Sequence, residues 1–142
     1  MIQFELITSN GPALSYEASE VILPTQSGQI GILQDHEHLI SLTSEGVIAI
    51  RKKASDTDEM LEYIAVSKDG VIEVAQNKVR ILADEATRGE DIDEKEASRA
   101  YETAQKMVAE AKDKQSLDQA MASLDRYAVR LKVAELKRRR RN

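Results

Sequence analysis

The spacing of apolar residues changes once along this chain, near residue 90, and the change restricts the folds that the chain can adopt. Before that point, apolar residues form short runs or alternate with polar neighbours, as Ile2, Phe4 and Leu6 do, which is typical of β-strands. After it, apolar residues recur every three or four positions, which is typical of amphipathic helices. We therefore expect an α+β protein, with an antiparallel β-sandwich or barrel over residues 1–86 and a helical hairpin over residues 87–142.

Further apolar runs follow the first one at close spacing. The runs predicted to form strands are residues 21–23, 46–50, 61–66, 70–75 and 78–83. Turn-forming residues separate them at residues 10–12, 67–70 and 76–77. The acidic stretch from Ala54 to Glu59 is expected to form a solvated hairpin loop. Because no helical pattern lies between these runs, the strands are expected to pair antiparallel.

The second region carries two amphipathic patterns, separated by the polar residues 113–115. The first begins at Asp91, where Asp91 or Asp93 is expected to cap a helix, and its apolar stripe is Ala97, Ala100, Tyr101, Ala104, Met107, Val108 and Ala111. The second is expected to begin at Ser116, in capping-box register with Gln119, and its stripe is Leu117, Met121, Leu124, Ala128 and Leu131. The short connection predicts an antiparallel hairpin. These alanine-rich stripes bury little area, so the hairpin is expected to lean on the sheet domain or a partner, and to move.

The two regions also differ in charge. Residues 1–86 carry 6 of the 20 basic residues and 14 of the 25 acidic ones, which indicates that the two regions face different partners. Cysteine is absent, which excludes disulfides, iron–sulfur clusters and cysteine zinc sites. No apolar run approaches the length of a membrane helix, and the N-terminus has no signal-peptide pattern. The chain is therefore expected to be cytosolic or docked on a membrane complex.

Both histidines lie in one segment, GQIGILQDHEHLI, residues 28–40. On an extended segment His36 and His38 would point the same way, which is acceptable geometry for two metal ligands. A catalytic zinc would need a third protein ligand, which here could only be aspartate or glutamate, so histidines that bind backbone or face solvent are the commoner outcome. Gly28 and Gly31 resemble half of a phosphate loop, but no Lys-Ser/Thr follows them. A tight turn and a close approach between strands explain these glycines better.

The chain ends in the basic run KRRRRN, residues 137–142. Such a run could bind nucleic acid, an anionic membrane surface or an acidic protein. It could equally be a solvated helix end whose charge suits the helix dipole. No basic groove or stacking aromatic residue accompanies it. The residues alone thus indicate a small sandwich with a mobile hairpin and no active site of its own.

Three blocks of the sequence, in order and over essentially the whole chain, resemble the epsilon subunit of F-type ATP synthases. The first is residues 28–40, in which the family's loop pattern is matched by Gly28, Ile30, Gly31, Ile32, His36 and Leu39. The second is ILADEATRGEDID, residues 81–93, at the family's junction between sheet domain and first helix. The third is RYAVRLKVAELK, residues 126–137, near the end of the family's second helix. His38 stands where the family commonly has proline, so the resemblance favours a local substitution over a pair of metal ligands.

The resemblance implies a non-catalytic rotor subunit that couples rotation of the c-subunit ring, through the gamma subunit, to ATP synthesis. It implies that the hairpin restrains ATP hydrolysis, and that the gamma and c-ring contact loop contains Gly28, Gln29, Ile30, Gly31 and His36. It implies that the second helix meets the beta subunit, in a head of alpha and beta subunits, through Arg126, Arg130, Lys132, Lys137 and Arg138. The implied location is the cytoplasmic face of a bacterial plasma membrane, with the chloroplast thylakoid as the second choice. Membrane contact would come only through the complex, with no nucleic acid and no metal.

Some bacterial members of the family bind ATP in the folded hairpin through the pattern Ile/Leu-Asp-x-x-Arg-Ala. Here the first helix offers Ile92 and Asp93, but Glu96 stands in place of the arginine, and Met121 occupies the corresponding place in the second helix. A guanidinium that would pair with phosphate is thus replaced by a carboxylate or a thioether. Arg99, three residues beyond Glu96, could compensate. We expect ATP binding to be weak or absent, and no other cofactor.

Two other functions compete with the rotor interpretation. One is a small metal-dependent hydrolase that uses His36 and His38. The other is a nucleic-acid-binding protein that uses residues 138–141, whose binding would be strongly salt-dependent. Both leave the three matching blocks unexplained.

Overall fold

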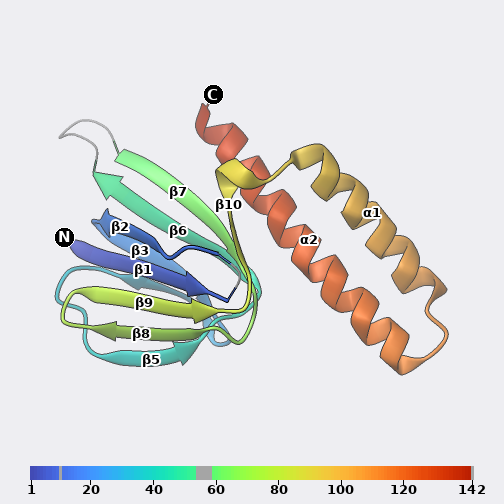
Figure 1. Cartoon of the computed structure of the whole chain (residues 1–142), viewed down its shortest axis with the longest axis horizontal. Helices are drawn as coiled ribbons and strands as arrows, with labels where there is room; N and C mark the ends of the chain where they lie inside the picture. Colours follow the sequence, from blue (N-terminus) through green and yellow to red (C-terminus); the bar gives the residue numbers. More distant parts are fainter. Residues whose placement is uncertain (10, 54–58, 142) are drawn as a thin grey trace.

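The computed structural model describes residues 1–9, 11–53 and 59–141, and Figure 1 shows two layers of strands with two helices beside one end. The first sheet has the strand order β2-β1-β9-β8-β5 and the second has the order β10-β7-β6-β3-β4. Among the described pairs, β1 and β9 run parallel and the others run antiparallel. The strands are β1 (Ile2–Thr8), β2 (Leu14–Ala18), β3 (Glu20–Thr25), β4 (Gly28–Ile32), β5 (Leu39–Leu42), β6 (Gly46–Lys53), β7 (Glu59–Val66), β8 (Val71–Ala75), β9 (Lys78–Ala83) and β10 (Ala86–Arg88). The expected α+β class is confirmed.

The two sheets enclose a core of Ile, Leu and Val side chains with one aromatic ring, that of Phe4. Inward and outward side chains alternate along the strands, as the β pleat requires, and the expected alternation of Ile2, Phe4 and Leu6 is confirmed. The largest core side chains are less than 2% exposed: Phe4, Ile2, Leu6, Leu23, Ile32, Ile48, Ile50, Ile64, Ile72, Ile81, Val21 and Val79. This single core fixes the positions of the loops and edges at which partners could bind.

The sequence predicts the inner strands but not the edge strands. All six predicted runs fall in inner strands, namely β1, β3, β6, β7, β8 and β9. The four strands without a sequence prediction, β2, β4, β5 and β10, lie at the edges of the two sheets. An edge strand buries few side chains, so its apolar alternation is weak. β10 spans the expected boundary between residues 86 and 87, and its pairing with β7 extends the sheet to Arg88.

Two of the expected turns are supported by their backbone angles. Gln76 and Asn77 both have positive φ, at 51° and 59°, as a two-residue type I′ turn between β8 and β9 requires. Asp69, in the turn between β7 and β8, has a φ of 64°. The turn expected at residues 10–12 includes Asn10, and the loop expected from Ala54 to Glu59 includes residues 54–58. These positions lie outside the described residues, and Glu59 already belongs to β7.

The sequence predicts the start of one helix more closely than that of the other. Of the two caps expected for the first helix, Asp91 is wrong, because the 3-10 turn η1 (Gly89–Asp91) precedes the helix α1 (Glu94–Glu110), and Asp93 is confirmed. Asp93 caps α1, because its Oδ1 accepts hydrogen bonds from the backbone N–H groups of Lys95 (3.0 Å) and Glu96 (3.2 Å).

The second helix, α2 (Lys114–Arg141), starts two residues before the expected start at Ser116, which is therefore wrong. The side chain of Asp113 accepts a hydrogen bond from the Ser116 N–H at 2.7 Å. Asp113, rather than Ser116, therefore provides the hydrogen bond to a free backbone N–H of the first helical turn. Hydrogen bonds from Ser116 lower the pKa of Asp113 from its usual value.

The side chains buried in the helices are small. The buried residues described there are Ala97, Ala104, Ala120, Ala134 and Val133. The expected apolar stripe on α2 is buried only in part, since Leu124 and Leu131 are half-buried whereas Leu117 is 39% exposed and Met121 is 43% exposed. The physical reason is that α2 contacts α1 on one side and the sandwich on another, so burial falls on the residues of those two sides.

Candidate interaction surfaces

The first candidate surface is the face of α2 that rests on the sandwich. α2 contacts β7, β6 and η1, beside the edge of the second sheet (Figure 1). A cleft of about 270 Å³ separates part of α2 from the adjacent strand ends. Its lining is mostly acidic: Glu45, Ser67, Lys68, Asp69, Asp84, Glu85, Ala122, Asp125 and Arg126. The docked helix is therefore seated beside negative charge, which attracts its own cations.

The five basic residues expected to meet a beta subunit do not form one patch in this conformation. Arg126, Arg130 and Lys137 are half-buried, whereas Lys132 and Arg138 are exposed. The Arg126 guanidinium lies 3.9 Å from the Glu85 carboxylate, and Arg130 stacks over the Tyr127 ring at 5.6 Å. Nζ of Lys137 donates a hydrogen bond to the Gly89 carbonyl oxygen at 3.3 Å, so Arg126 and Lys137 already have partners outside the helices.

The terminal basic run is partly paired within the chain. Arg138 forms an ion pair of 2.8 Å with Glu94, and Arg139 forms one with Glu135. Both pairs are exposed, so each contributes little to stability. Side chains beyond Arg139 lie outside the described ones.

The second candidate surface is β4 with the loop that follows it. Gly28 has a φ of 117°, so the expected role of this glycine in a tight turn is confirmed. The expected close approach at Gly31 is wrong, because a Cβ built there meets no atom within 4 Å. Gln29 is exposed and Ile30 packs against the core. β4 therefore offers an open, uncharged sheet edge, of the kind that natural sheets usually cover.

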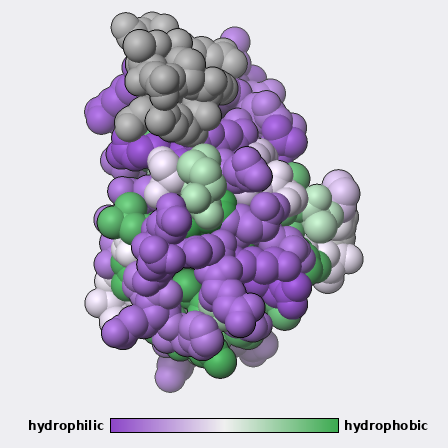
Figure 2. Space-filling view, turned by 90° about the vertical axis from the view of Figure 1, so that its left-hand side faces the viewer, coloured by the Kyte–Doolittle hydropathy of each residue, from purple (hydrophilic) through white to green (hydrophobic). Residues whose placement is uncertain are grey.

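The histidines of this loop make backbone or solvent contacts. His36 is half-buried, and its Nδ1 lies 2.7 Å from the Glu37 carbonyl oxygen. His38 is exposed. Over the described ranges, no group of three or more His, Asp or Glu side chains is arranged to hold a metal ion. Figure 2 shows that the end of the sandwich farthest from the helices is mostly hydrophilic, with apolar patches among the polar side chains.

The third surface is one that sequence reasoning missed. On the outer face of the first sheet, Leu42 lies opposite Val71, Val71 opposite Leu82, and Leu82 beside Ile7. We call these four residues the apolar row. Leu42, Val71 and Leu82 are 42%, 41% and 46% exposed, and Ile40, also on β5, is 77% exposed. The available signal was Leu82, which holds an outward position of its strand, where a solvated sheet face would carry a polar residue.

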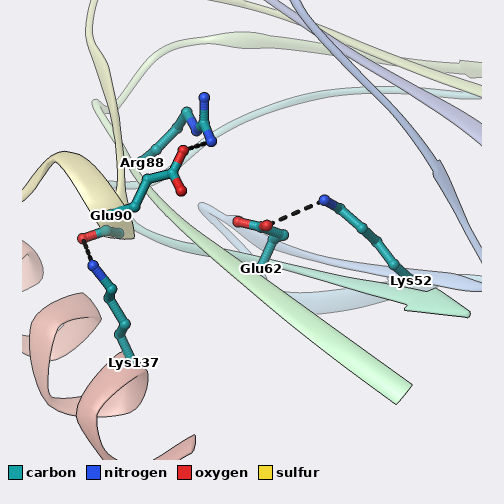
Figure 3. Close-up of polar contacts among 6 residues, drawn as sticks. Lys52, Glu62, Arg88, Glu90 and Lys137 are labelled. Carbon is teal, nitrogen blue, oxygen red and sulfur yellow. Dashed lines mark hydrogen bonds and ion pairs between the residues drawn. The ribbon is translucent and has the colours of Figure 1, made fainter. Parts of the chain in front are cut away.

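Polar side chains also form contacts between strands, away from the apolar row. Lys52 forms an ion pair of 3.1 Å with Glu62, as Figure 3 shows, and lies 4.0 Å from the centre of the Tyr16 ring. Arg88 pairs with Glu90. Burial raises the pKa of Tyr16, which keeps its hydroxyl neutral near pH 7. These contacts join β2, β6 and β7 to one another and β10 to η1, and they hold structure rather than perform chemistry.

Family models for the delta/epsilon chain of ATP synthase match both parts of this chain. The β-sandwich domain matches residues 1–89, and the long α-helix domain matches residues 90–135. The chain belongs to the ATP synthase delta/epsilon family. The epsilon resemblance expected from the three sequence blocks is thereby confirmed, and the family explains the chain better than either alternative function does.

A curated relative agrees with this assignment, and two solved structures agree with the fold. The chain is 33% identical over 135 residues to the ATP synthase epsilon chain of Neisseria meningitidis, covering 95% of this chain and 94% of that one. The fold resembles a chain of the Euglena gracilis mitochondrial ATP synthase, with a TM-score of 0.78, 21% identity, and coverage of 94% and 80%. It also resembles a chain of the Tetrahymena thermophila mitochondrial central stalk and c-ring, with a TM-score of 0.60, 14% identity, and coverage of 92% and 94%. No helix over the described residues is long and apolar enough to cross a membrane.

The residues for which the family resemblance suggested nucleotide binding lie near a cavity of about 220 Å³ between α1, α2 and the strand that precedes them. Ile92 and Asp93 line this cavity, but Arg99 is not among its lining residues. Arg130 from α2 is the one cation in the lining. It faces three carboxylates, those of Asp91, Asp93 and Glu96, so the cavity is a poor site for a polyphosphate.

Calorimetric titration of the full chain with ATP is therefore expected to show no saturable binding below about 1 mM. The variant Glu96→Arg is expected to bind at least about tenfold more tightly, because a charge-assisted hydrogen bond to phosphate contributes about 1.5–3 kcal/mol. Glu102→Arg makes the same charge change at an exposed position of α1 outside the cavity lining, and serves as the control. Micromolar affinity of the unchanged chain would contradict this prediction.

Proposed function

We propose that this chain is the epsilon-type subunit of the central stalk of a rotary ATP synthase. In this role it has no active site, couples the gamma subunit to the c-subunit ring, and restrains ATP hydrolysis through its helices. The proposal includes the alpha and beta subunits as partners of the helices. It places the complex on the cytoplasmic face of a bacterial plasma membrane, with the chain bound only through the complex.

The observation that best supports this role is the outward face of α2. Leu117, Met121, Leu124, Ala128 and Leu131 follow one another at alternating steps of four and three residues, which is a heptad seam. In the docked hairpin Leu117 and Met121 are 39% and 43% exposed and Ala128 is exposed, whereas Leu124 and Leu131 are half-buried. A heptad seam packs against another helix, so it supports a second conformation in which α2 leaves the sandwich and lies along a helical partner such as gamma.

The basic residues of α2 support the same movement. Arg126, Arg130 and Lys137 point toward the chain's own sandwich while the hairpin is docked. A contact between these cations and an acidic segment of beta therefore requires the hairpin to leave. We assign the docked state to free rotation and the released state to the restraint of hydrolysis.

The apolar row is the surface that we assign to gamma. Three aliphatic side chains, each at least 41% exposed, lie side by side on the outer face of one sheet. Rows of this kind on an otherwise charged surface mark protein interfaces. The open edge of β4, with Gly28, Gln29, Ile30 and Gly31, and the nearby His36 form the surface assigned to gamma and the c ring.

Binding of the full chain to the cognate gamma subunit tests the proposal. Gel filtration with light scattering is expected to show a one-to-one complex, with a dissociation constant below about 1 µM. Because the assigned contact is mainly apolar, raising the salt concentration is expected to change the affinity little. The proposed function is wrong if the chain binds neither gamma nor the assembled alpha–beta–gamma head.

A further inference from the structure

The last turns of α2 meet the rest of the chain at Gly89, the first residue of η1. Gly89 is buried, and it lies between the backbone of β7 and the side chains of α2. It follows β10 directly, so it is the point at which the chain leaves the sandwich for the hairpin. A contact here can control whether the hairpin stays docked.

The approach of α2 to Gly89 leaves too little space for a side chain unless the neighbouring atoms shift by a few tenths of an ångström. A Cβ built on Gly89 would lie 3.2 Å from the Tyr63 carbonyl oxygen and 3.2 Å from Cγ1 of Val133. It would also lie 3.7 Å from Cδ of Lys137. Tyr63 belongs to the rigid strand β7, and Val133 is fully buried at 0% exposure, so neither can yield freely. The backbone angle of Gly89 does not require glycine, so the missing side chain serves this close contact.

The Gly89 carbonyl oxygen also holds α2 by a hydrogen bond. It accepts one hydrogen bond from the Ile92 N–H at 3.2 Å and a second from Nζ of Lys137 at 3.3 Å, the latter drawn in Figure 3. The aliphatic stem of Lys137 lies along the glycine, and its ammonium group reaches the carbonyl. Gly89 thus combines an apolar contact with Val133 and a polar contact with Lys137.

We infer that Gly89, Val133 and Lys137 form a latch that keeps the hairpin docked, and that the latch withholds Lys137 from partners. The Arg126–Glu85 ion pair also joins α2 to the sandwich side, but it lies at the surface, so its weak and salt-screened attraction only supplements the latch. The latch is a property of the isolated chain. Its consequence, that docking and binding of the head compete for Lys137, rests on the proposed function.

The variant Gly89→Ala in the full chain tests the latch. The added methyl group pushes Val133 away from the junction, and tryptic cleavage at the basic residues of α2 is expected to accelerate about tenfold or more. Hydrogen exchange in the inner strands is expected to stay unchanged. Gly31→Ala is the matched control, because a Cβ at that position meets no atom within 4 Å. Equal cleavage rates in the two variants would overturn the latch.

Two further variants keep the test decisive if Gly89→Ala disturbs the sandwich itself. Val133→Ala removes the apolar contact, and Lys137→Met removes the hydrogen bond while keeping an aliphatic stem. Both are expected to speed cleavage of α2, and Lys137→Met by the smaller factor, since only one hydrogen bond is lost. Cleavage at the rate of the unchanged chain in both variants would also overturn the latch. Because this assay contains no gamma subunit, failure of the latch leaves the proposed function standing, and failure to bind gamma leaves the latch standing.

Discussion

Aspartate in place of Leu82 is expected to weaken binding of the full chain to the gamma subunit about 100-fold or more, while the sandwich stays folded. Leu82 occupies the middle of the apolar row, between Val71 and Ile7, and its side chain is 46% exposed in the free chain. A carboxylate there is solvated before binding but would be buried without a partner against an apolar surface. Such burial costs several kcal/mol, which is more than a rim contact could offset.

Isothermal titration of the Leu82→Asp variant with gamma measures this effect. Met107→Asp is the matched control, because Met107 is exposed to a similar degree, at 50%, but lies on α1. The two variants lose similar apolar area and gain the same charge. An affinity for gamma that falls equally in both, or in neither, would mean that the apolar row is not the gamma surface.

The sequence predicts those strands that have a neighbouring strand on each side in the sheet. The inner strands β1, β3, β6, β7, β8 and β9 show apolar runs because their inward residues fill the core. The edge strands β2, β4, β5 and β10 do not show them, since a strand with one neighbour can expose most of its side chains. The sequence predicts antiparallel pairing and the turn between β8 and β9, but the antiparallel expectation is wrong for β1 and β9. The parallel pair of β1 and β9 joins residues more than seventy positions apart, and no local pattern encodes it.

The helices show a different limit of sequence reasoning. Periodicity locates both of them, but it selects Leu117 and Met121 for the buried face of α2, where the structure buries Ala120 and Val133 instead. Periodicity identifies an apolar stripe without saying when that stripe is buried. We interpret this stripe as a face that is used in another conformation, so the error points to function.

Some of the candidate surfaces could be identified from the sequence, and others needed the structure. The loop with Gly28 and His36 was found through resemblance to the family, whereas the apolar row needed the strand register that places Leu42, Val71 and Leu82 side by side. The family resemblance identified the basic residues of α2. Which of them face the sandwich and which face solvent depends on how α2 rests on the sandwich. Gly89 belongs to the second sequence block that resembles the family, residues 81–93. Its role in the latch, however, is inferred from its distances to Tyr63 and Val133.

A disulfide between positions 89 and 133 is expected to have a large effect on the synthase. The chain has no cysteine, so Gly89→Cys with Val133→Cys introduces the only pair. A Cβ at position 89 lies 3.2 Å from Cγ1 of Val133, close to the ~3 Å that separates a Cβ from the opposite sulfur of a disulfide. Oxidation therefore locks the hairpin in its docked state, and reduction frees it, with the cysteine at position 89 also crowding the latch.

The measurement that tests the account most directly is ATP hydrolysis by the cognate synthase assembled with this double variant, before and after reduction. The Val133→Cys single variant, treated in the same way, shows any effect of the reductant on other subunits. We expect the locked, oxidised complex to hydrolyse ATP several-fold faster than the reduced complex, because a docked hairpin cannot reach the head. A complex that assembles but hydrolyses ATP at the same rate in both states, or more slowly when locked, would contradict the claim that release of the hairpin restrains hydrolysis.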